Sequence, residues 1–314
     1  MMSAGTLTWK QLIGDLTDAL KPLRFGPPVT HVYNPLEYAQ APFQEYLRRY
    51  GGGRKEALLV GMNPGPWGMA QTGIPFGEVT SVAEWMRIAA PVRSPQDVHP
   101  KRPVDGFGCR RSEVSGKRLW GWAQRTFCTP EKFFARFLVV NYCPLMFIES
   151  SGRNRTPDKL PVAEQRRLFA ACDRALLRAA QKVRPHYVFG IGRFAAERAR
   201  SALSALDVVF GQITHPSPAN PRANRGWAAL IEQELSGAGL TLESIQKPGD
   251  CEFWIADCEL SRWKNPQSEI RNPQCGGFGM SSRHYPRFRA IASKFAVRAA
   301  PGSSSHTPLV GGAP

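Results

Sequence analysis

The fold is decided by the stretch Leu58-Leu-Val-Gly-Met-Asn-Pro-Gly-Pro-Trp-Gly-Met-Ala-Gln-Thr-Gly-Ile-Pro-Phe-Gly-Glu-Val-Thr80. The apolar run at 57–60 predicts a buried strand of a parallel sheet. Five glycines and three prolines follow between positions 61 and 77, and they exclude regular structure there. Ligands of open parallel sheets bind beyond the carboxyl ends of the strands, so this segment predicts a site for a small planar ligand. A rigid surface loop is the alternative.

Outward from this stretch, apolar runs predict three more strands, at 137–141, 187–191 and 208–214. Helical spacing predicts helices at 7–22, 42–50, 80–90 and 161–183. It predicts two more, one that begins at about Phe194 and one that follows Trp227 and ends at about Leu235. The segments 23–40, 91–116 and 151–157 are expected to be irregular. Alternating strands and helices favour parallel pairing, with helices on both faces of the sheet.

The chain of 314 residues divides by composition into two parts. Residues 1–241 carry the strands and helices, and we expect one catalytic domain there. Periodicity fades in residues 242–314, where Pro, Gly and Ser accumulate toward the end, so we expect a largely disordered extension.

The positive net charge of the chain favours a polyanionic partner, and nucleic acid is the first candidate. The net charge is +16, and from residue 241 onward there are only 9 Lys and Arg against 6 Asp and Glu. The excess therefore belongs to the body of the chain. Ordinary solubilising charge is the alternative.

No apolar run reaches about 18 residues, so no membrane span is expected. None of the seven cysteines forms a Cys-x-x-Cys pair, so no metal is expected.

Distinctive polar residues end three of the predicted strands: Asn63, Asn141 and His215. Singly, they are compatible with a turn residue, a loop cap and a partly buried histidine. If the sheet is parallel, all three lie on one edge. An amide offers both a donor and an acceptor, which reading the edge of a base requires. Phe76 or Trp67 could supply a stacking face.

Other catalytic patterns are missing from the sequence. No Ser-His-Asp order and no phosphate-binding Gly-x-x-x-x-Gly-Lys motif occurs. The acids nearest the first loop, Glu78 and Glu84, have no evident partner carboxylate, which disfavours a two-carboxylate hydrolase.

Two long segments resemble the signature motifs of the single-strand-selective monofunctional uracil-DNA glycosylases. They are Gly61–Val79, within the stretch quoted above, and His215-Pro-Ser-Pro-Ala-Asn-Pro-Arg-Ala-Asn-Arg-Gly-Trp227. Shorter agreements are Tyr33-Asn-Pro-Leu-Glu-Tyr38, His99-Pro-Lys-Arg-Pro103, Ser112-Glu-Val-Ser-Gly116, Asn141-Tyr-Cys-Pro-Leu145 and Ser151-Gly-Arg-Asn154. The resemblance covers about residues 23–240.

The resemblance implies an α/β/α sandwich around a four-stranded parallel sheet. It also implies hydrolysis of the N-glycosidic bond of uracil, and of 5-substituted uracils such as 5-hydroxymethyluracil, in single- and double-stranded DNA. By motif position, Asn63 would place the attacking water and His215 would bond uracil O2. Further substrate-binding positions would be Met62 and Met69 lining the pocket, Gly65 leaving room at C5, Phe76 stacking on the ring and Asn141 reading its edge.

The segment that follows His215 would enter the duplex as the base leaves. Its DNA-binding positions would be Pro216, Ser217, Pro218, Ala219, Arg222 and Arg225. A known member of the family carries an arginine where Ala219 stands, so the identity of the wedge residue is open here. The resemblance implies no cofactor and no metal, and we expect a monomer that binds DNA. The expected compartment is the nucleus in a eukaryotic host, and the cytoplasm or nucleoid in a bacterial one.

Two other functions stay open at this point. A damaged-base binder with weak catalysis would keep the pocket and the basic surface but wedge poorly, and Ala219 motivates it. A glycosylase shifted to deaminated purines, xanthine or hypoxanthine, is the other.

Overall fold

The computed structural model of the protein describes residues 7–242, and its centre is a parallel four-stranded sheet. The strands are β2 (Ala57–Gly61), β3 (Phe137–Asn141), β6 (Tyr187–Ile191) and β7 (Val209–Ile213). They lie in the order β3-β2-β6-β7, and every neighbouring pair is parallel. The predicted strands are confirmed, and their carboxyl ends share one edge of the sheet.

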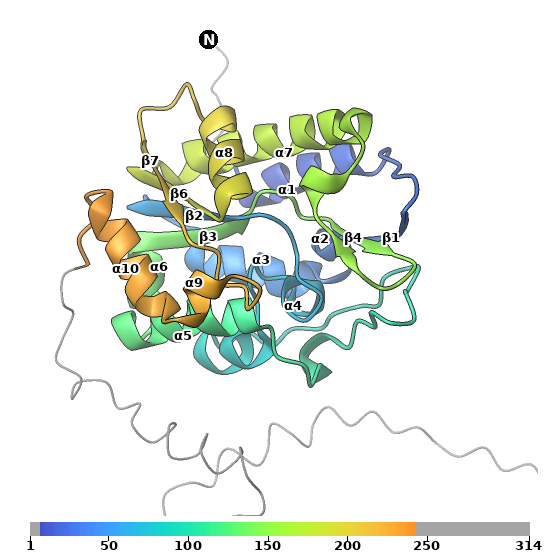
Figure 1. Ribbon diagram of the computed structural model, residues 1–314, viewed down its shortest axis with the longest axis horizontal. Helices are drawn as coiled ribbons and strands as arrows, with labels where there is room; N and C mark the ends of the chain where they lie inside the picture. The colour runs from blue at the N-terminus through green and yellow to red at the C-terminus, as the bar shows by residue number, and fades with distance from the viewer. Residues whose placement is uncertain (1–6, 243–314) are drawn as a thin grey trace, which may run out of the picture. The chain divides into compact units, whose positions relative to one another are not determined.

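Helices cover both faces of this sheet, which confirms the three-layer α/β/α architecture (Figure 1). One layer holds α1 (Trp9–Leu20), α7 (Val162–Val183) and α8 (Arg193–Ala202). The other holds α3 (Gln40–Tyr50), α5 (Val114–Phe127), α6 (Pro130–Arg136) and α10 (Trp227–Gly237). The chain places β3 on one side of β2 and β6 on the other, so the topological switch point lies between β2 and β6. Open sheets of this kind bind ligands there, beyond the carboxyl ends of the strands.

A second, antiparallel sheet contradicts two predictions of irregular structure. It is built from β1 (Val29–Tyr33), β4 (Met146–Glu149) and β5 (Asn154–Arg155), in the order β1-β4-β5. The segments 23–40 and 151–157 therefore each contain a strand. Both strands are short and only partly buried. Their partner β4 supplies the pairing, and the local residue pattern does not reveal that partner.

The predicted helix at 80–90 is wrong beyond its first turn. Only a π-helical turn forms, Ser81–Trp85, and the Glu78 carboxylate caps it by accepting from the amide and hydroxyl of Ser81. Arg87 then adopts a left-handed backbone (φ 55°), which ends the helix. The sequence did not predict the helices α5 and α6, which bury the aromatic residues Trp120 and Phe133. The ring of Phe133 stacks on Phe137 of β3.

The remaining elements are short. They are the helices α2 (Pro35–Tyr38), α4 (Met69–Thr72) and α9 (Pro221–Asn224), and 3-10 turns at Gly106–Gly108 and Pro157–Lys159. The predicted extension at 242–314 lies outside the described residues, except for Leu242, which packs partly buried against the core.

Candidate active site

The end of β2 brings two predicted site residues together above Gly61. Gly61 pairs with Asn141 in the β2–β3 register. A Cβ built on Gly61 would lie 2.3 Å from Asn141 Oδ1 and 2.6 Å from Phe76 Cε2. The amide of Asn141 and the ring of Phe76 therefore converge on a space that only glycine leaves open.

Phe76 is held in an unusual backbone conformation. Its φ is 53°, a left-handed value that is uncommon for a residue other than glycine. The indole of Trp120 donates to the Phe76 carbonyl (2.8 Å), and a Cβ on Gly116 would lie 2.1 Å from that same oxygen. Such conformations cost about 1–3 kcal/mol and cluster at functional sites. The ring is thus presented at the strand ends by α5 packing behind it.

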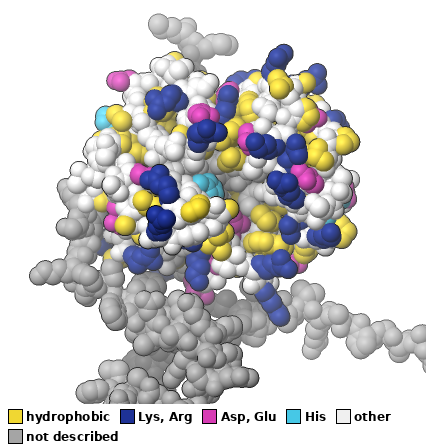
Figure 2. Space-filling view, in the orientation of Figure 1, with side chains coloured by type: hydrophobic (Ala, Val, Ile, Leu, Met, Phe, Trp, Pro, Cys, Tyr) yellow, Lys and Arg dark blue, Asp and Glu magenta, His cyan; other side chains and the backbone are white. Residues whose placement is uncertain are grey.

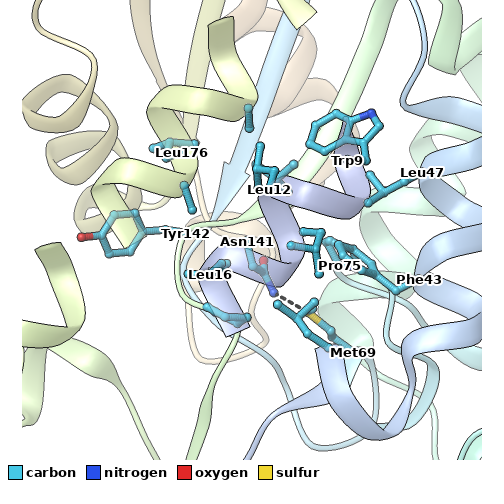
Figure 3. Close-up of a pocket in the computed structure, with 16 residues that line it drawn as sticks. Trp9, Leu12, Leu16, Phe43, Leu47, Met69, Pro75, Asn141, Tyr142 and Leu176 are labelled. Atoms are coloured by element: carbon cyan, nitrogen blue, oxygen red, sulfur yellow. Dashed lines mark hydrogen bonds between the residues drawn. The ribbon is translucent and has the colours of Figure 1, made fainter. Parts of the chain in front are cut away.

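Asn141 is directed by its neighbour Met69. Its Nδ2 lies 3.1 Å from Met69 Sδ, and Figure 3 shows the amide turned toward that sulfur. Its Oδ1 is buried and accepts no hydrogen bond from any residue between 7 and 242. Asn141 and Met69 also line an apolar cavity of about 50 Å³ enclosed by side chains of α1, α3 and α7. Phe76 and His215 do not line that cavity.

His215 follows β7 and faces Phe76, with ring centroids 6.1 Å apart. A Cβ on Gly192, at the end of β6, would come within 3.4 Å of it. The amide of Ser217 donates to His215 Nδ1 (3.1 Å), so in the neutral ring the proton is on Nε2. Burial lowers the pKa of His215 to about 4. At neutral pH the residue is therefore an uncharged Nε2–H donor.

The segment before His215 is fixed by α10. The carboxylate of Glu234 accepts from both the amide (2.6 Å) and the hydroxyl (2.5 Å) of Thr214. The indole of Trp227 donates to the Thr214 carbonyl at 2.6 Å. These contacts hold the chain on both sides of Thr214, so the imidazole is positioned before any ligand arrives. Sequence reasoning missed this role of Glu234.

Asn63 lies at the same edge, two residues beyond β2, and is partly exposed. Its Nδ2 donates to the Leu145 carbonyl over 3.4 Å, a long bond that leaves Oδ1 available as an acceptor. Met62, beside it, continues the strand pairing through its carbonyl, which accepts from the Cys143 amide (2.9 Å). We call Asn63, Phe76, Asn141 and His215 the strand-end site.

Gly65 does not face open space. A Cβ there would lie 2.2 Å from Glu113 Oε1, so the Glu113 carboxyl occupies the volume where a side chain would begin. Burial raises the pKa of Glu113 to about 7. The sequence reading quoted Glu113 within a family motif but gave it no role. A single carboxylate in a loop carries no spacing signal that could have revealed this contact.

The segment 216–226 is tied to the body of the protein. Arg118 of α5 donates to the Pro216 carbonyl (3.0 Å) and to Asn224 Oδ1 (2.9 Å). Asn224 Nδ2 in turn donates to the Pro218 carbonyl (3.0 Å). We call this segment the tethered loop. The predicted DNA-binding residues on it include the exposed Pro218, Ala219, Arg222 and Arg225, and the partly buried Ser217.

Basic side chains surround this region. Figure 2 shows Lys and Arg more often than Asp and Glu over the visible face. The ring of Trp67, in the loop after β2, is contacted by the guanidinium groups of Arg102 and Arg111. Their Cζ atoms lie 5.3 Å and 4.4 Å from the ring centroid. Within residues 7–242 no cluster of His, Cys, Asp and Glu could hold a metal ion. No helix in the same range is long and apolar enough to cross a membrane.

Comparison with known proteins identifies the family. The model of the uracil DNA glycosylase superfamily matches residues 49–234. A protein of Bos taurus named single-strand selective monofunctional uracil DNA glycosylase is 48% identical over 227 residues, which are 72% of this chain and 84% of that protein. Its namesake from Mus musculus is 47% identical over 228 residues, 72% of this chain and 81% of that protein.

A solved structure agrees on the fold. The crystal structure of wild-type SMUG2 from Pedobacter heparinus has a TM-score of 0.52 and 16% identity, covering 72% of this chain and 96% of that chain. Because the mammalian relatives match nearly half of the aligned residues over most of their length, this chain belongs to the single-strand-selective monofunctional uracil-DNA glycosylases, within the uracil-DNA glycosylase superfamily.

Proposed function

We propose that this protein excises uracil from DNA by hydrolysing the N-glycosidic bond, and that it leaves an abasic site. The base must leave the stack before it can reach the strand-end site, at a cost of about a few kcal/mol. Family membership supports the reaction, and the surplus of Lys and Arg supports a DNA substrate.

The observation that carries this proposal is the buried, unpaired Oδ1 of Asn141. Leaving such an acceptor without a donor costs about 1–3 kcal/mol. Uracil offers a donor at N3 next to an acceptor at O4, which complements Oδ1 and Nδ2 of one amide. Cytosine offers an acceptor at N3 and a donor at its amino group, so the same amide orientation opposes it. The site thus favours uracil by its hydrogen-bond pattern.

His215 is suited to stabilise the departing base. As the glycosidic bond lengthens, negative charge spreads onto the uracil oxygens. The neutral imidazole can donate Nε2–H to O2 while Ser217 keeps its Nδ1 occupied. A preorganised donor of this kind is typically worth about 2.7–4 kcal/mol of barrier. Phe76, within 6.1 Å of the imidazole, would stack on the base during the same step.

Asn63 is suited to place the attacking water. Its free Oδ1 can accept a hydrogen bond from water while its Nδ2 keeps donating to the Leu145 carbonyl. An amide cannot take up a proton as a carboxylate can, so water must attack a sugar that already carries positive charge. Departure of the base therefore precedes or accompanies the attack, and the role of Asn63 is orientation.

We extend the proposal to 5-substituted uracils and to both single- and double-stranded DNA. The tethered loop, with Arg222 and Arg225 exposed, supports contact with a duplex, and a monomer suffices for the strand-end site. A nuclear location in a eukaryotic host, or a location in the cytoplasm or nucleoid of a bacterial one, stays a prediction.

Single-turnover cleavage of an oligonucleotide with one uracil tests the proposal. We expect alkali-labile product from the wild type, and at least a 100-fold slower release from Asn63→Ala and from His215→Leu, by loss of water placement and of the O2 donor. Circular dichroism checks that both variants fold. Binding of the oligonucleotide without product would favour the damaged-base binder. Product only from xanthine or hypoxanthine strands would favour the deaminated-purine enzyme.

A further inference from the structure

Glu113 immediately precedes α5, where a short polar side chain would ordinarily cap the helix. Its side chain makes no capping hydrogen bond to α5. It turns instead toward the loop after β2, where Oε2 accepts from the amide of Trp67 (3.3 Å) and the carboxyl also bonds the amide of Gly68. The carboxyl is thus placed by the glycine-rich loop rather than by its own helix.

The carboxyl fills the space that position 65 leaves open. A Cβ on Gly65 would lie 2.2 Å from Oε1, 2.4 Å from Oε2 and 2.6 Å from Cδ of Glu113. A Cβ on Gly68 would lie 2.9 Å from Oε2. The two glycines therefore let a polar group approach the loop backbone. The wall beside Gly65 is a carboxyl, not a void and not a hydrocarbon ring.

The contacts also order the groups around the expected base. His215 neighbours Phe76, Phe76 meets Asn141 above Gly61, and Asn141 reaches Met69. Met69 directly follows Gly68, which borders Glu113. Around a uracil ring, the atoms after O2 are N3, then C4 with its O4, then C5. With O2 at His215 and the N3–O4 edge at Asn141, the next wall meets C5.

We propose that Glu113 determines specificity at C5, by accepting a hydrogen bond from a hydroxyl carried on that carbon. This inference rests on the proposed function and deepens it, by naming the residue that separates 5-hydroxymethyluracil from thymine. A methyl group at C5 would face the partly buried carboxyl without offering it a donor, which is costly. A hydroxymethyl group supplies the donor. Sites built to bond a substrate hydroxyl reject the analogue without it strongly, by up to about 10⁴–10⁵-fold.

Single-turnover release from oligonucleotides carrying uracil, 5-hydroxymethyluracil or thymine tests this. For Glu113→Leu we expect the ratio of 5-hydroxymethyluracil to uracil release to fall at least tenfold, and thymine to be discriminated less from 5-hydroxymethyluracil. Glu113→Gln keeps an acceptor oxygen and should restore most of the ratio. Glu45→Leu removes a partly exposed carboxylate of α3 that pairs with Arg48 and Arg49; it is the matched control and should leave the ratio unchanged.

A merely structural role for Glu113 would slow all three substrates equally, and that result overturns the proposal. A wild type that releases uracil but not 5-hydroxymethyluracil also overturns it, while leaving uracil excision intact. If the wild type releases no base, the proposed function fails. In that case the preference among uracil, 5-hydroxymethyluracil and thymine is measured as the binding affinity for 2′-fluoro oligonucleotides that carry these bases. Equal affinity ratios for wild type and Glu113→Leu would then reject it.

A double-mutant cycle gives an independent check. Gly65→Ala alone forces the carboxyl to move, so it should reduce 5-hydroxymethyluracil release more than uracil release. In a Glu113→Ala background the added methyl meets no carboxyl, and the same substitution should have a smaller effect. Additive effects in the two backgrounds would mean that the two positions are not coupled.

Discussion

At the scale of single residues, the absent side chain of Gly61 is as important as the side chains that surround it. Gly61→Ala would place a methyl 2.3 Å from Asn141 Oδ1 and 2.6 Å from the Phe76 ring, and both must shift. A displacement of about 1 Å can cost about 100-fold in rate, so we expect a loss of that order in single-turnover uracil release. Overpacking should also lower the free energy of unfolding by about 1–3 kcal/mol.

The control for that substitution is Gly14→Ala. Gly14 lies inside α1 with nothing near its missing Cβ. There alanine should raise the free energy of unfolding by about 0.5–1 kcal/mol and leave uracil release unchanged. Wild-type release by Gly61→Ala would show that Asn141 and Phe76 need not meet above β2.

Sequence reasoning found the residues at the strand ends but not those that hold them. Asn63, Asn141 and His215 could be predicted to share one edge, because parallel strands align their carboxyl ends. Glu113 and Glu234 could not, because their partners are backbone amides and a threonine far away along the chain. Such contacts depend on how α5 and α10 pack, which no local pattern records.

At the scale of elements, the tethered loop is already in place without DNA. Arg118 joins its two ends through Pro216 and Asn224. Arg118→Met should leave the loop to be ordered during binding, which costs about 1–2 kcal/mol for each residue fixed. Duplex substrate demands more of a wedge than single-stranded substrate does. We therefore expect the ratio of duplex to single-strand uracil release to fall about tenfold.

Arg125→Met removes an equal charge from an exposed position of the same helix and should leave that ratio unchanged. The salt dependence of DNA binding separates the two possible roles of Arg118. A phosphate contact would reduce the slope of log affinity against log salt by about 1 in the variant. If the salt slope is unchanged and the ratio of duplex to single-strand release falls, Arg118 acts by holding the tethered loop. If that ratio is unchanged, this role is contradicted.

The elements also show where sequence patterns run out. The strands β2, β3 and β6 are apolar runs that are largely buried, and they were predictable for that reason. The edge strand β7 has mixed burial. The strands β1 and β5 lie in a small sheet with mixed burial, so tertiary pairing with β4 decides their structure. The expected helix after Thr80 failed because the left-handed Arg87 ends it within two residues of the π-helical turn.

At the scale of the whole molecule, two partly buried site residues make stability depend on pH in opposite directions. His215 has a pKa of about 4 when folded, against an ordinary 6.5. The unfolded chain therefore binds the extra proton, and stability falls as pH drops from 6.5 toward 4. Glu113 has a pKa of about 7 when folded, against an ordinary 4.5. Here the folded state holds the proton, and stability falls as pH rises from 4.5 toward 7.

The contribution of Glu113 can be isolated by urea denaturation between pH 5 and pH 8. At pH 5 its carboxyl is neutral in the folded state, so Glu113→Gln should differ little from the wild type. At pH 8 the wild type buries a charge that the variant lacks. At about 1.36 kcal/mol for each pKa unit, the variant should then be more stable by about 3 kcal/mol. In Glu45→Gln, where Arg48 and Arg49 lower the pKa of Glu45 to about 2, the difference from wild type should stay constant over this range. A flat difference for Glu113→Gln as well would mean that the Glu113 carboxyl is solvated in the folded state and that burial does not raise its pKa.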